Sequence, residues 1–397
     1  MSLDTRTDTS AGAEMRRKVN DSLALIAKNA DRAERERKVP VENIEALRDA
    51  GFFKALQPAR YGGTPMGADE YAPAVVAIAQ ACASTAWASG LLAQHSHLIA
   101  LMSVDLQDEI WADDPDALVS SSVAAINDCT EVDGGVRLRG RWGWSSGCDH
   151  AKWAILGFRR AVTALDGLVL PHFAVVPMKD LTIIDDWHVA ALRGTGSKTL
   201  ELDDVFVPDY RIECLFDLMA GGSRGFGTHP GIFHAPFTPW FSLGFSAVSL
   251  GISLRFLELY KDRVKSRVRA YTGAAEINSV PAFLRVAESH HQLSAVQATL
   301  EKDWKSMTEH AMASQLPTPD VDVHWRANQS YATKMSIEAL DRLWSAAGGS
   351  VFFDSSEMQR LWRDSKMTGA HAYSDYDVAR HRHGRQLLGL EPDVTIF

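Results

Sequence analysis

The chain has 397 residues, which exceeds a usual single domain and predicts two or three structural units that could share one large core. Its 46% hydrophobic and 23% charged residues are typical of a globular protein. The formal net charge of -9 disfavours a nucleic-acid or anionic-membrane surface, because both partners would repel an acidic protein.

The cysteines and the N-terminus favour a cytoplasmic protein. The four cysteines are scattered without Cys-x-x-Cys spacing, so neither a disulfide framework nor a zinc site is expected. Residues 1–12 are polar and lack the apolar core of a signal peptide, and no window approaches the roughly 20 apolar residues that span a bilayer. We expect a soluble protein with no membrane contact and a short disordered start.

The first part of the chain shows helical periodicity. Apolar residues recur at helical spacing over 14–37, which predicts one amphipathic surface helix. Pro40 begins a second helix over 41–50, and Gly51 closes it. Further helices are expected over 69–84, 87–102 and 106–111.

Short β-rich runs replace the helical pattern between about residues 117 and 207, with turn residues at 133–135. The following stretch, 214–244, is rich in Gly, Pro, His and Phe, and such a long irregular segment is often a functional loop. Strands are expected over 119–126, 136–142, 153–158, 173–176 and 198–206.

The last third of the chain is helical again. The order of helices, a β-rich middle and a helical bundle is uncommon, although architecture alone does not establish activity. The expected long helices cover 245–268, 281–311, 323–347 and 356–388.

Five segments resemble a known family. Residues 51–63 (GFFKALQPARYGG) look like the end of the first helical hairpin of acyl-CoA dehydrogenases. With the other four, they resemble the oxygenase components of two-component flavin-dependent monooxygenases with the acyl-CoA dehydrogenase fold, especially the 4-hydroxyphenylacetate 3-hydroxylase group. The similarity covers nearly the whole chain beyond the first dozen residues. The other segments are 142–150 (WGWSSGCDH), 192–197 (LRGTGS), 267–273 (RVRAYTG) and 359–364 (QRLWRD).

The resemblance implies a mixed, mostly α fold of the acyl-CoA dehydrogenase type. It implies an N-terminal helical domain (1–115), a central β-barrel-like domain (116–213), an irregular active-site loop (214–244) and a C-terminal four-helix bundle (245–397). It also implies assembly as a homotetramer.

One departure from the dehydrogenases bears on the reaction. Many of those enzymes carry a proton-abstracting glutamate in the stretch that here reads MTGAHAY, 367–373. This stretch has no carboxylate, and His371 stands where the related hydroxylases have their base. An imidazole with a pKa near 6.5 can take a proton from a phenol, which makes the ring a better nucleophile. The alternative for His371 is a histidine packed within the bundle.

The resemblance implies an enzyme that hydroxylates a small phenolic aromatic through flavin C4a-hydroperoxide, with O2 as co-substrate. Reduced FMN is preferred over reduced FAD (FADH2). No Gly-x-Gly-x-x-Gly follows a strand and opens a helix, and no Walker sequence occurs, so a resident nicotinamide site is not supported. A separate NAD(P)H-flavin reductase is therefore expected to supply the reduced flavin.

Three residues are candidates for catalysis: His371, Ser146 and His95. The resemblance places Ser146 against flavin N5, and the alternative is a serine that only forms a turn. It places His95 beside the flavin and the substrate. His95 and His97 lack nearby carboxylate or cysteine partners, so no metal site is expected.

The resemblance also implies two sets of binding residues. Arg267, Tyr271 and Thr272 are expected to reach the flavin phosphate or a neighbouring subunit. The flavin set is Trp87, Ser120, Ser121, Ser146, Arg267, Tyr271 and Thr272, and the substrate set is His95, Ser121, Thr238, Phe241, His371 and Tyr373. For Trp87, ordinary core packing is the alternative.

Thr238 indicates the charge of the substrate. The similar 4-hydroxyphenylacetate hydroxylases carry an arginine at this position, which meets the substrate carboxylate. A hydroxyl in its place removes a charge-assisted anchor, and an unpaired carboxylate in an apolar pocket is costly. We therefore expect a neutral or differently substituted aromatic substrate, with Tyr373 offering one neutral hydrogen bond.

Other functions stay open at this stage. A monooxygenase that acts on indole, nitrogen or sulfur needs no phenol deprotonation, and His371 counts against it. An acyl-CoA dehydrogenase lacks its glutamate here. A flavin carrier without catalysis would produce hydrogen peroxide regardless of any aromatic.

Overall fold

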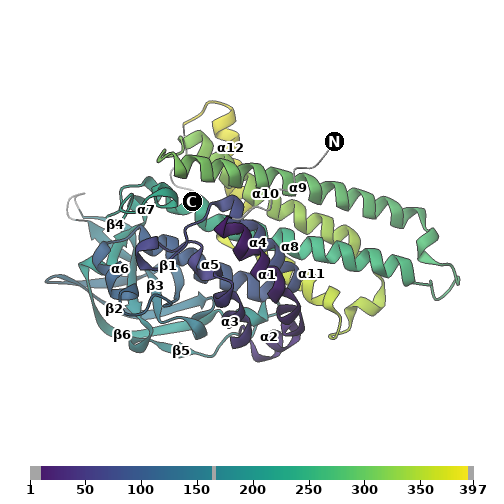
Figure 1. Cartoon of the computed structure of the whole chain (residues 1–397), viewed down its shortest axis with the longest axis horizontal. Coiled ribbons are helices and arrows are strands. Elements are labelled where there is room, and N and C mark those ends of the chain that lie inside the picture. Colours follow the sequence, from purple (N-terminus) through teal and green to yellow (C-terminus); the bar gives the residue numbers. More distant parts are fainter. Residues whose placement is uncertain (1–9, 163–166, 392–397) are drawn as a thin grey trace.

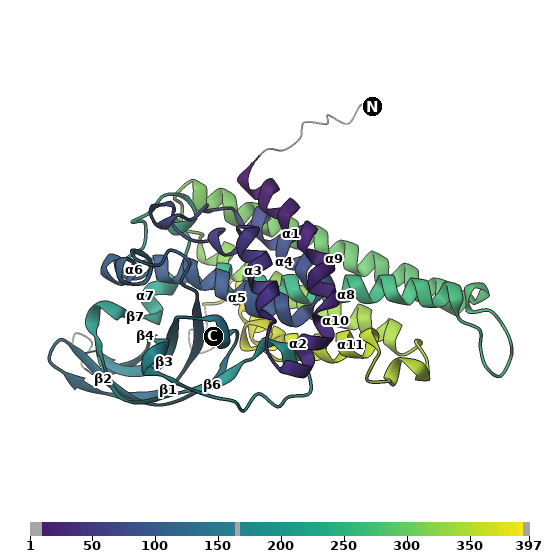
Figure 2. The ribbon, with the colours of Figure 1, turned by 60° about the horizontal axis from the view of Figure 1, so that its bottom comes forward.

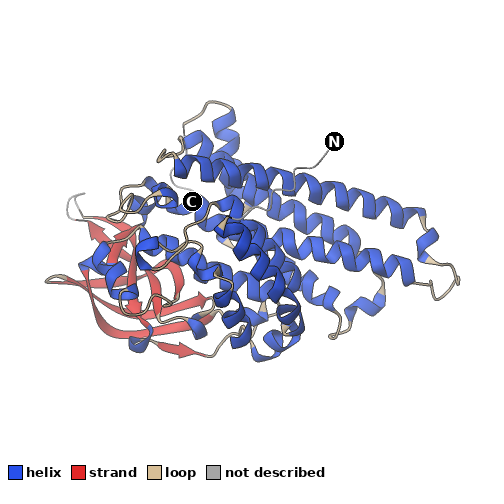
Figure 3. Ribbon diagram, viewed as in Figure 1, coloured by secondary structure: helices blue, strands red, loops and turns tan. Residues whose placement is uncertain are grey.

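A curved β-sheet lies at one end of the molecule, and long helices pack against it and extend away from it (Figures 1 and 3). This computed structural model describes residues 10–162 and 167–391. Residues 1–9, which the sequence predicted to be disordered, lie outside the described residues. The N-terminal helices are α1 (Ala11–Lys28), α2 (Ala30–Glu36), α3 (Val41–Asp49), α4 (Ala68–Ala81), α5 (Ala83–Ala100) and α6 (Val104–Trp111).

The single helix predicted over 14–37 is two helices that meet at Asn29. The side chain of Asn29 donates to Asn43 Oδ1 at 2.8 Å, and Asn43 Nδ2 donates to Thr85 Oγ1 at 3.1 Å. This buried polar chain ties α2 to α3 and α5, because buried amides need partners. The sequence pattern did not reveal it.

Helix α5 positions one wall of the site. Every one of its residues is buried, which is typical of a helix in the centre of a protein. It packs against α4, α8 and strand β1 (Val119–Val132). Trp87, Leu91 and His95 are spaced four residues apart, so they lie on one face of α5.

Among the described residues, one sheet has the strand order β5-β6-β2-β1-β3-β4-β7. Strand β1 pairs parallel with β3 and antiparallel with β2, with an irregularity between Ser122 and Asn127. The sheet curls around a second core that includes Trp142, Phe158 and Leu200 (Figure 2). The remaining strands are β2 (Gly135–Ser145), β3 (Trp153–Val162), β4 (Leu168–Pro177), β5 (Thr182–Ile184), β6 (Lys198–Pro208) and β7 (Ile212–Cys214).

Two predictions for this region need correction. The sequence analysis missed β5 and β7, because three-residue strands are too short to show an alternating pattern. The stretch 214–244 is not wholly irregular, since it contains α7 (Leu215–Ala220) and the start of α8 (Phe237–Ser266). Pro236 caps α8, and Pro239 is tolerated in its first turn, where the missing N–H would have no partner within the helix.

The C-terminal bundle contains α8, α9 (Val280–Met312), α10 (Pro319–Trp344), α11 (Glu357–Thr368) and α12 (Tyr376–Leu387). The prediction of one helix over 356–388 is wrong, because the chain breaks between α11 and α12. Buried Arg326 of α10 donates to the carbonyl oxygens of Ala372 and Tyr373 at this break. His371 therefore lies on a non-helical turn.

The expectation that no segment is long and apolar enough to span a bilayer does not hold for helix α8. Among the described residues it is long and apolar enough to cross a membrane by length and composition, which the sequence analysis excluded for every window. Its most apolar stretch is 89% buried inside the protein, as in the core helix of a bundle.

Candidate active site

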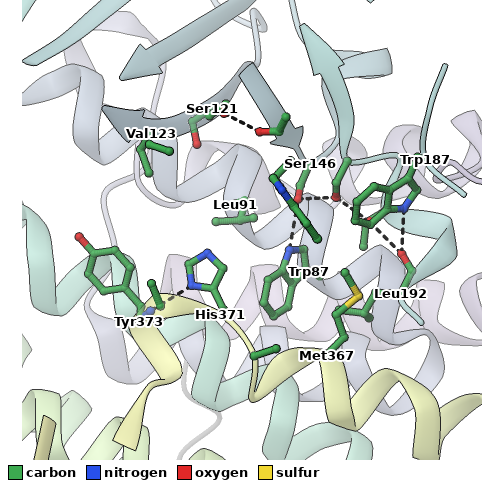
Figure 4. Close-up of a pocket in the computed structure, with 18 of the residues that line it drawn as sticks. Trp87, Leu91, Ser121, Val123, Ser146, Trp187, Leu192, Met367, His371 and Tyr373 are labelled. Atoms are coloured by element: carbon green, nitrogen blue, oxygen red, sulfur yellow. Dashed lines mark hydrogen bonds between the residues drawn. The ribbon is translucent and has the colours of Figure 1, made fainter. Parts of the chain in front are cut away.

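A cavity of about 470 Å³ lies where α5, the sheet, the 192–197 loop and the α11–α12 break meet. This volume is in the range of small-molecule sites. Its residues come from five separate parts of the chain, 87–91, 121–146, 187–197, 241 and 367–373, and Figure 4 shows most of them. They are Trp87, Leu91, Ser121, Ser122, Val123, Ala124, Gly143, Trp144, Ser146, Trp187, Leu192, Thr195, Ser197, Phe241, Met367, Ala370, His371, Ala372 and Tyr373.

One wall of the cavity is a cluster of hydroxyl groups at the end of β2. Ser146 Oγ accepts a hydrogen bond from Trp87 Nε1 at 3.3 Å and lies 2.7 Å from Ser197 Oγ. Ser197 Oγ lies 2.7 Å from Thr195 Oγ1, which donates to the carbonyl oxygen of Leu192 at 2.8 Å. Ser146 therefore joins three elements at the cavity, β2, α5 and the 192–197 loop.

The opposite wall is aromatic. The His371 ring stacks on Phe245 with centroids 4.1 Å apart, and it meets the Trp87 ring edge-on at 5.7 Å. Phe241, one turn before Phe245 on α8, packs edge-on against Tyr373 at 5.1 Å. Figure 4 shows His371 between Tyr373 and Trp87, with Ser146 across the cavity. Stacked rings of this kind favour a flat aromatic guest.

His371 is a neutral imidazole with its ring proton on Nε2. Burial, and to a smaller degree the charge of Arg326, lowers the pKa of His371 to about 4. Its Nδ1 accepts the backbone N–H of Tyr373 at 3.2 Å, so the neutral ring carries its proton on Nε2. In this arrangement His371 offers the cavity a donor. The sequence analysis had assumed an ordinary pKa and a free acceptor.

His95 has the opposite arrangement. Its Nδ1 lies 2.7 Å from the carbonyl oxygen of Val119, so Nδ1 donates and Nε2 is the free acceptor. Burial lowers the pKa of His95 to about 4, and Nε2 is buried without a hydrogen-bond partner. The His95 ring stacks on Phe241 at 6.1 Å, behind the residues that line the cavity. A buried acceptor without a partner is costly unless a ligand supplies a proton.

The 192–197 loop is held by α11. Leu192 has a left-handed backbone (φ 48°), and its N–H donates to Asp364 Oδ1 at 2.6 Å. Burial raises the pKa of Asp364 to about 6. Arg363, the neighbour of Asp364, donates to the carbonyl of Ala190. Two segments of the family resemblance, 192–197 and 359–364, are thus in direct contact.

The structure brings most of the predicted site residues together. Trp87, Ser121, Ser146, Phe241, His371 and Tyr373 line the cavity, while Ser120 lies just behind it and accepts from Ser145 Oγ at 3.1 Å. Thr238 lies one turn before Phe241 on α8, and its buried Oγ1 has no hydrogen-bond partner. Its side chain does not line the cavity.

Three predicted flavin residues lie elsewhere. Arg267, Tyr271 and Thr272 belong to the connection between α8 and α9, which Figure 1 shows at the far end of the bundle. Arg267 follows Phe245 by 22 residues, about 33 Å along a helix of 1.5 Å rise. Arg267 donates to the carbonyl of Ala346, and Tyr271 is fully exposed. Within one chain these residues do not reach the cavity.

Sequence reasoning missed Trp144, Trp187, Thr195 and Ser197 as lining residues. Trp144 has a left-handed backbone (φ 70°) that is uncommon outside glycine, is 65% exposed and packs edge-on against Trp187 at 5.2 Å. Strained residues of this kind often mark functional sites. All four lie in or near segments of the family resemblance, which was the available signal.

These residues fit a flavin ring. The cavity is lined by aromatic and small side chains, as a flat ring requires, and no charged side chain is among the described residues that line it. The hydroxyl of Ser146 and the indole of Trp87 provide polar groups at one wall. No cluster of His, Cys, Asp or Glu that could hold a metal occurs among the described residues.

Two parts of the chain match patterns of known protein families. The pattern described as "Acyl-CoA dehydrogenase, N-terminal domain" matches residues 9–109, and "Acyl-CoA dehydrogenase, C-terminal domain" matches 243–376. The "p-hydroxyphenylacetate 3-hydroxylase, oxygenase component" of Acinetobacter baumannii is 50% identical over 393 residues, 98% of this chain and 93% of that protein.

Two further relatives agree. The "FADH(2)-dependent resorcinol hydroxylase, oxygenase component" of Rhizobium sp. is 33% identical over 378 residues, 93% of this chain and 92% of that protein. The crystal structure of 3-HSA hydroxylase from Rhodococcus sp. RHA1 matches with a TM-score of 0.90 and 30% identity, over 97% of this chain and 99% of that chain.

Proposed function

Because this chain belongs to the acyl-CoA dehydrogenase family, among the oxygenase components of flavin-dependent two-component monooxygenases, we propose that it hydroxylates a small neutral phenol. The observation that carries this proposal is a cavity with a hydroxyl wall at Ser146, an aromatic wall at His371 and no charged lining side chain among the described residues. Such walls exclude water and bind flat, uncharged rings.

The flavin belongs against the hydroxyl wall. A bound reduced flavin supplies the oxygen-transfer chemistry with O2, and the protein supplies binding, orientation and a dry cavity. Ser146 would meet flavin N5, and Trp87, Ser120 and Ser121 would surround the ring. Hydrogen bonding by Ser146 at N5 would hold the N5 proton in place and limit the wasteful release of hydrogen peroxide.

Two histidines would act on the phenol, one as proton acceptor and the other as hydrogen-bond donor. His95 Nε2 is a buried acceptor without a partner, which suits the proton of a phenolic hydroxyl. His371 Nε2–H is a donor, which suits the negative charge that develops on the phenolic oxygen. This replaces the expectation that His371 is the base, because its Nδ1 already accepts the backbone N–H of Tyr373. The lowered pKa is common to both histidines and does not distinguish them.

The substrate would be uncharged. Arg224, a cation in the 214–244 stretch, is already paired with Glu213 at 3.0 Å. Arg326 lies under the Tyr373 ring and donates to backbone carbonyls. Neither side chain lines the cavity, so a carboxylate there would have no cationic partner among the described residues.

The quaternary structure would complete the flavin site. Arg267, Tyr271 and Thr272 lie far from the cavity of their own chain, so they would bind the flavin phosphate of a neighbouring subunit in a homotetramer. We propose reduced FMN as the flavin, and reduced FAD as the alternative because the resorcinol hydroxylase is named for FADH2. The relatives are called oxygenase components, so a separate cytoplasmic NAD(P)H-flavin reductase would supply the reduced flavin.

An array of phenols and indoles tests this function. The purified protein is mixed with chemically reduced FMN and each compound in air, and hydroxylated product is counted per flavin oxidised. Neutral phenols should give high ratios, and the protein alone should neither be yellow nor oxidise NADH. FAD that survives dialysis and is reduced by an acyl-CoA would contradict the proposal.

A further inference from the structure

Three hydroxyl groups form a continuous chain at the cavity wall, and their protons have one direction. A carbonyl oxygen only accepts, so at 2.8 Å Thr195 Oγ1 must donate to Leu192 O. A hydroxyl has a single proton. Ser197 must therefore donate to Thr195 across their 2.7 Å contact, and Ser146 must donate to Ser197 across the next 2.7 Å contact.

The reverse direction is unfavourable. If Thr195 donated to Ser197 instead, its oxygen and the Leu192 carbonyl oxygen would face each other at 2.8 Å with no proton between them. All the side chains are buried, so water does not compensate such a contact. The Leu192 carbonyl itself is held in place, because it also accepts from the Thr195 N–H at 3.1 Å and from Trp187 Nε1 at 3.3 Å.

The fixed direction of these hydrogen bonds leaves Ser146 Oγ with one lone pair that has no partner. Its proton goes to Ser197, and one lone pair of Oγ accepts from Trp87 Nε1 at 3.3 Å. A hydroxyl oxygen has two lone pairs, so one remains. Ser146 lines the cavity (Figure 4), and it therefore presents an acceptor there and no donor.

We propose that Thr195 and Ser197 are positioning residues that fix Ser146 as an acceptor, so that the site selects reduced over oxidised flavin. This rests on the proposed function, in which Ser146 meets flavin N5. Reduced flavin has an N–H at N5, which such an acceptor binds. Oxidised flavin has a lone pair at N5, which a fixed acceptor repels, and an unmade buried hydrogen bond is costly.

Anaerobic titrations of reduced and oxidised FMN, followed by the flavin spectrum, test the proposal without turnover. Ser197→Ala and Thr195→Val each release the Ser146 proton, which can then turn to the cavity and donate to N5. Both variants should bind oxidised FMN about tenfold more tightly relative to reduced FMN. The two-electron potential of the bound flavin should fall by about 30 mV, the value of that tenfold change.

Matched variants separate this role from general damage. Ser197→Thr and Thr195→Ser keep the hydroxyls and should restore the wild-type ratio. Ser145→Ala removes a buried hydroxyl beside Ser146, outside the chain, and should leave the ratio unchanged. Ser146→Ala removes the acceptor and should weaken the binding of reduced FMN.

The outcomes distinguish this proposal from the proposed function. An unchanged ratio in Ser197→Ala and Thr195→Val, with a changed ratio in Ser146→Ala, would overturn the role of the hydroxyl chain alone. An unchanged ratio in all three would also overturn the placement of N5 at Ser146. A wild-type protein that binds no reduced flavin would contradict the proposed function itself.

Discussion

At the scale of single residues, buried His95 and half-buried His371 present opposite groups, because different backbone atoms hold them. The carbonyl of Val119 fixes the proton of His95 on Nδ1, while the N–H of Tyr373 fixes that of His371 on Nε2. The chemistry of each imidazole is thus set by its backbone partner, which no sequence motif specifies.

Raising the pH should separate the two histidines. At neutral pH, His95→Ala and His371→Ala should each hydroxylate roughly 10²-fold more slowly. Near pH 9 a phenol of pKa about 10 begins to ionise without help, so only His95→Ala, which lacks the acceptor, should recover. Product formation rates at pH 7 and pH 9 measure this, with His97→Gln as a control on α5.

If the hydroxylation rate of His371→Ala recovers at pH 9 and that of His95→Ala does not, His371 is the proton acceptor and His95 the donor. A lack of pH recovery in both variants would show that deprotonation of a phenol is not part of the reaction.

Position 238, one turn before the cavity residue Phe241 on α8, should control whether a charged substrate is accepted, because a longer side chain there would extend towards the cavity. The Thr238→Arg variant should bind 4-hydroxyphenylacetate at least tenfold more tightly, because a guanidinium can pair with the carboxylate. Thr238→Met, of similar reach but without charge, should not. Spectroscopic titration with each ligand measures the affinities, and tight binding of the acid by the wild type would refute a neutral site.

At the scale of elements, the 192–197 loop depends on α11. Asp364→Ala would leave the Leu192 N–H buried without an acceptor, which should lower the free energy of unfolding by about 1–3 kcal/mol. Asp364→Asn keeps an acceptor oxygen, so its free energy of unfolding should fall by less. Urea unfolding and hydrogen exchange of residues 192–197 measure this, and wild-type values in Asp364→Ala would show that the contact does not hold the loop.

Sequence reasoning succeeded where elements were long and periodic. It found the order of helices, sheet and bundle, and the family resemblance singled out two segments, 142–150 and 192–197, that line the cavity. It missed the break between α11 and α12, since residues 369–375 contain no proline and Arg326, which holds the break, is about 45 residues away in the chain. It also missed the role of Ser197, because hydrogen bonds between distant residues are a property of the folded chain.

At the scale of the whole molecule, buried neutral histidines should make stability depend on pH. Burial lowers the pKa of His95, His97 and His371 to about 4, below the value of about 6.5 in an unfolded chain. Between these values the unfolded chain binds more protons, so stability falls as pH falls. Between pH 7 and pH 5, the titration of each histidine should lower the free energy of unfolding by about 2 kcal/mol.

Asp364 acts in the opposite sense, because burial raises its pKa to about 6. Its protonation between pH 7 and pH 5 should restore about 1 kcal/mol of the free energy of unfolding that the histidines lose. Chemical unfolding at pH 7 and pH 5 measures the difference. His97→Gln removes one of the three titrations and should show a smaller pH dependence. Equal stability of the wild-type protein at both pH values would contradict the burial of neutral imidazoles.

The origin of the oxygen atom in the product tests the proposed hydroxylation most directly. The protein, chemically reduced FMN and a neutral phenol are mixed under ¹⁸O₂ without any reductase, and the product is analysed by mass spectrometry. The product should be a hydroxylated phenol that carries one ¹⁸O atom. Unlabelled product, or no product while an acyl-CoA reduces flavin on the protein, would contradict it.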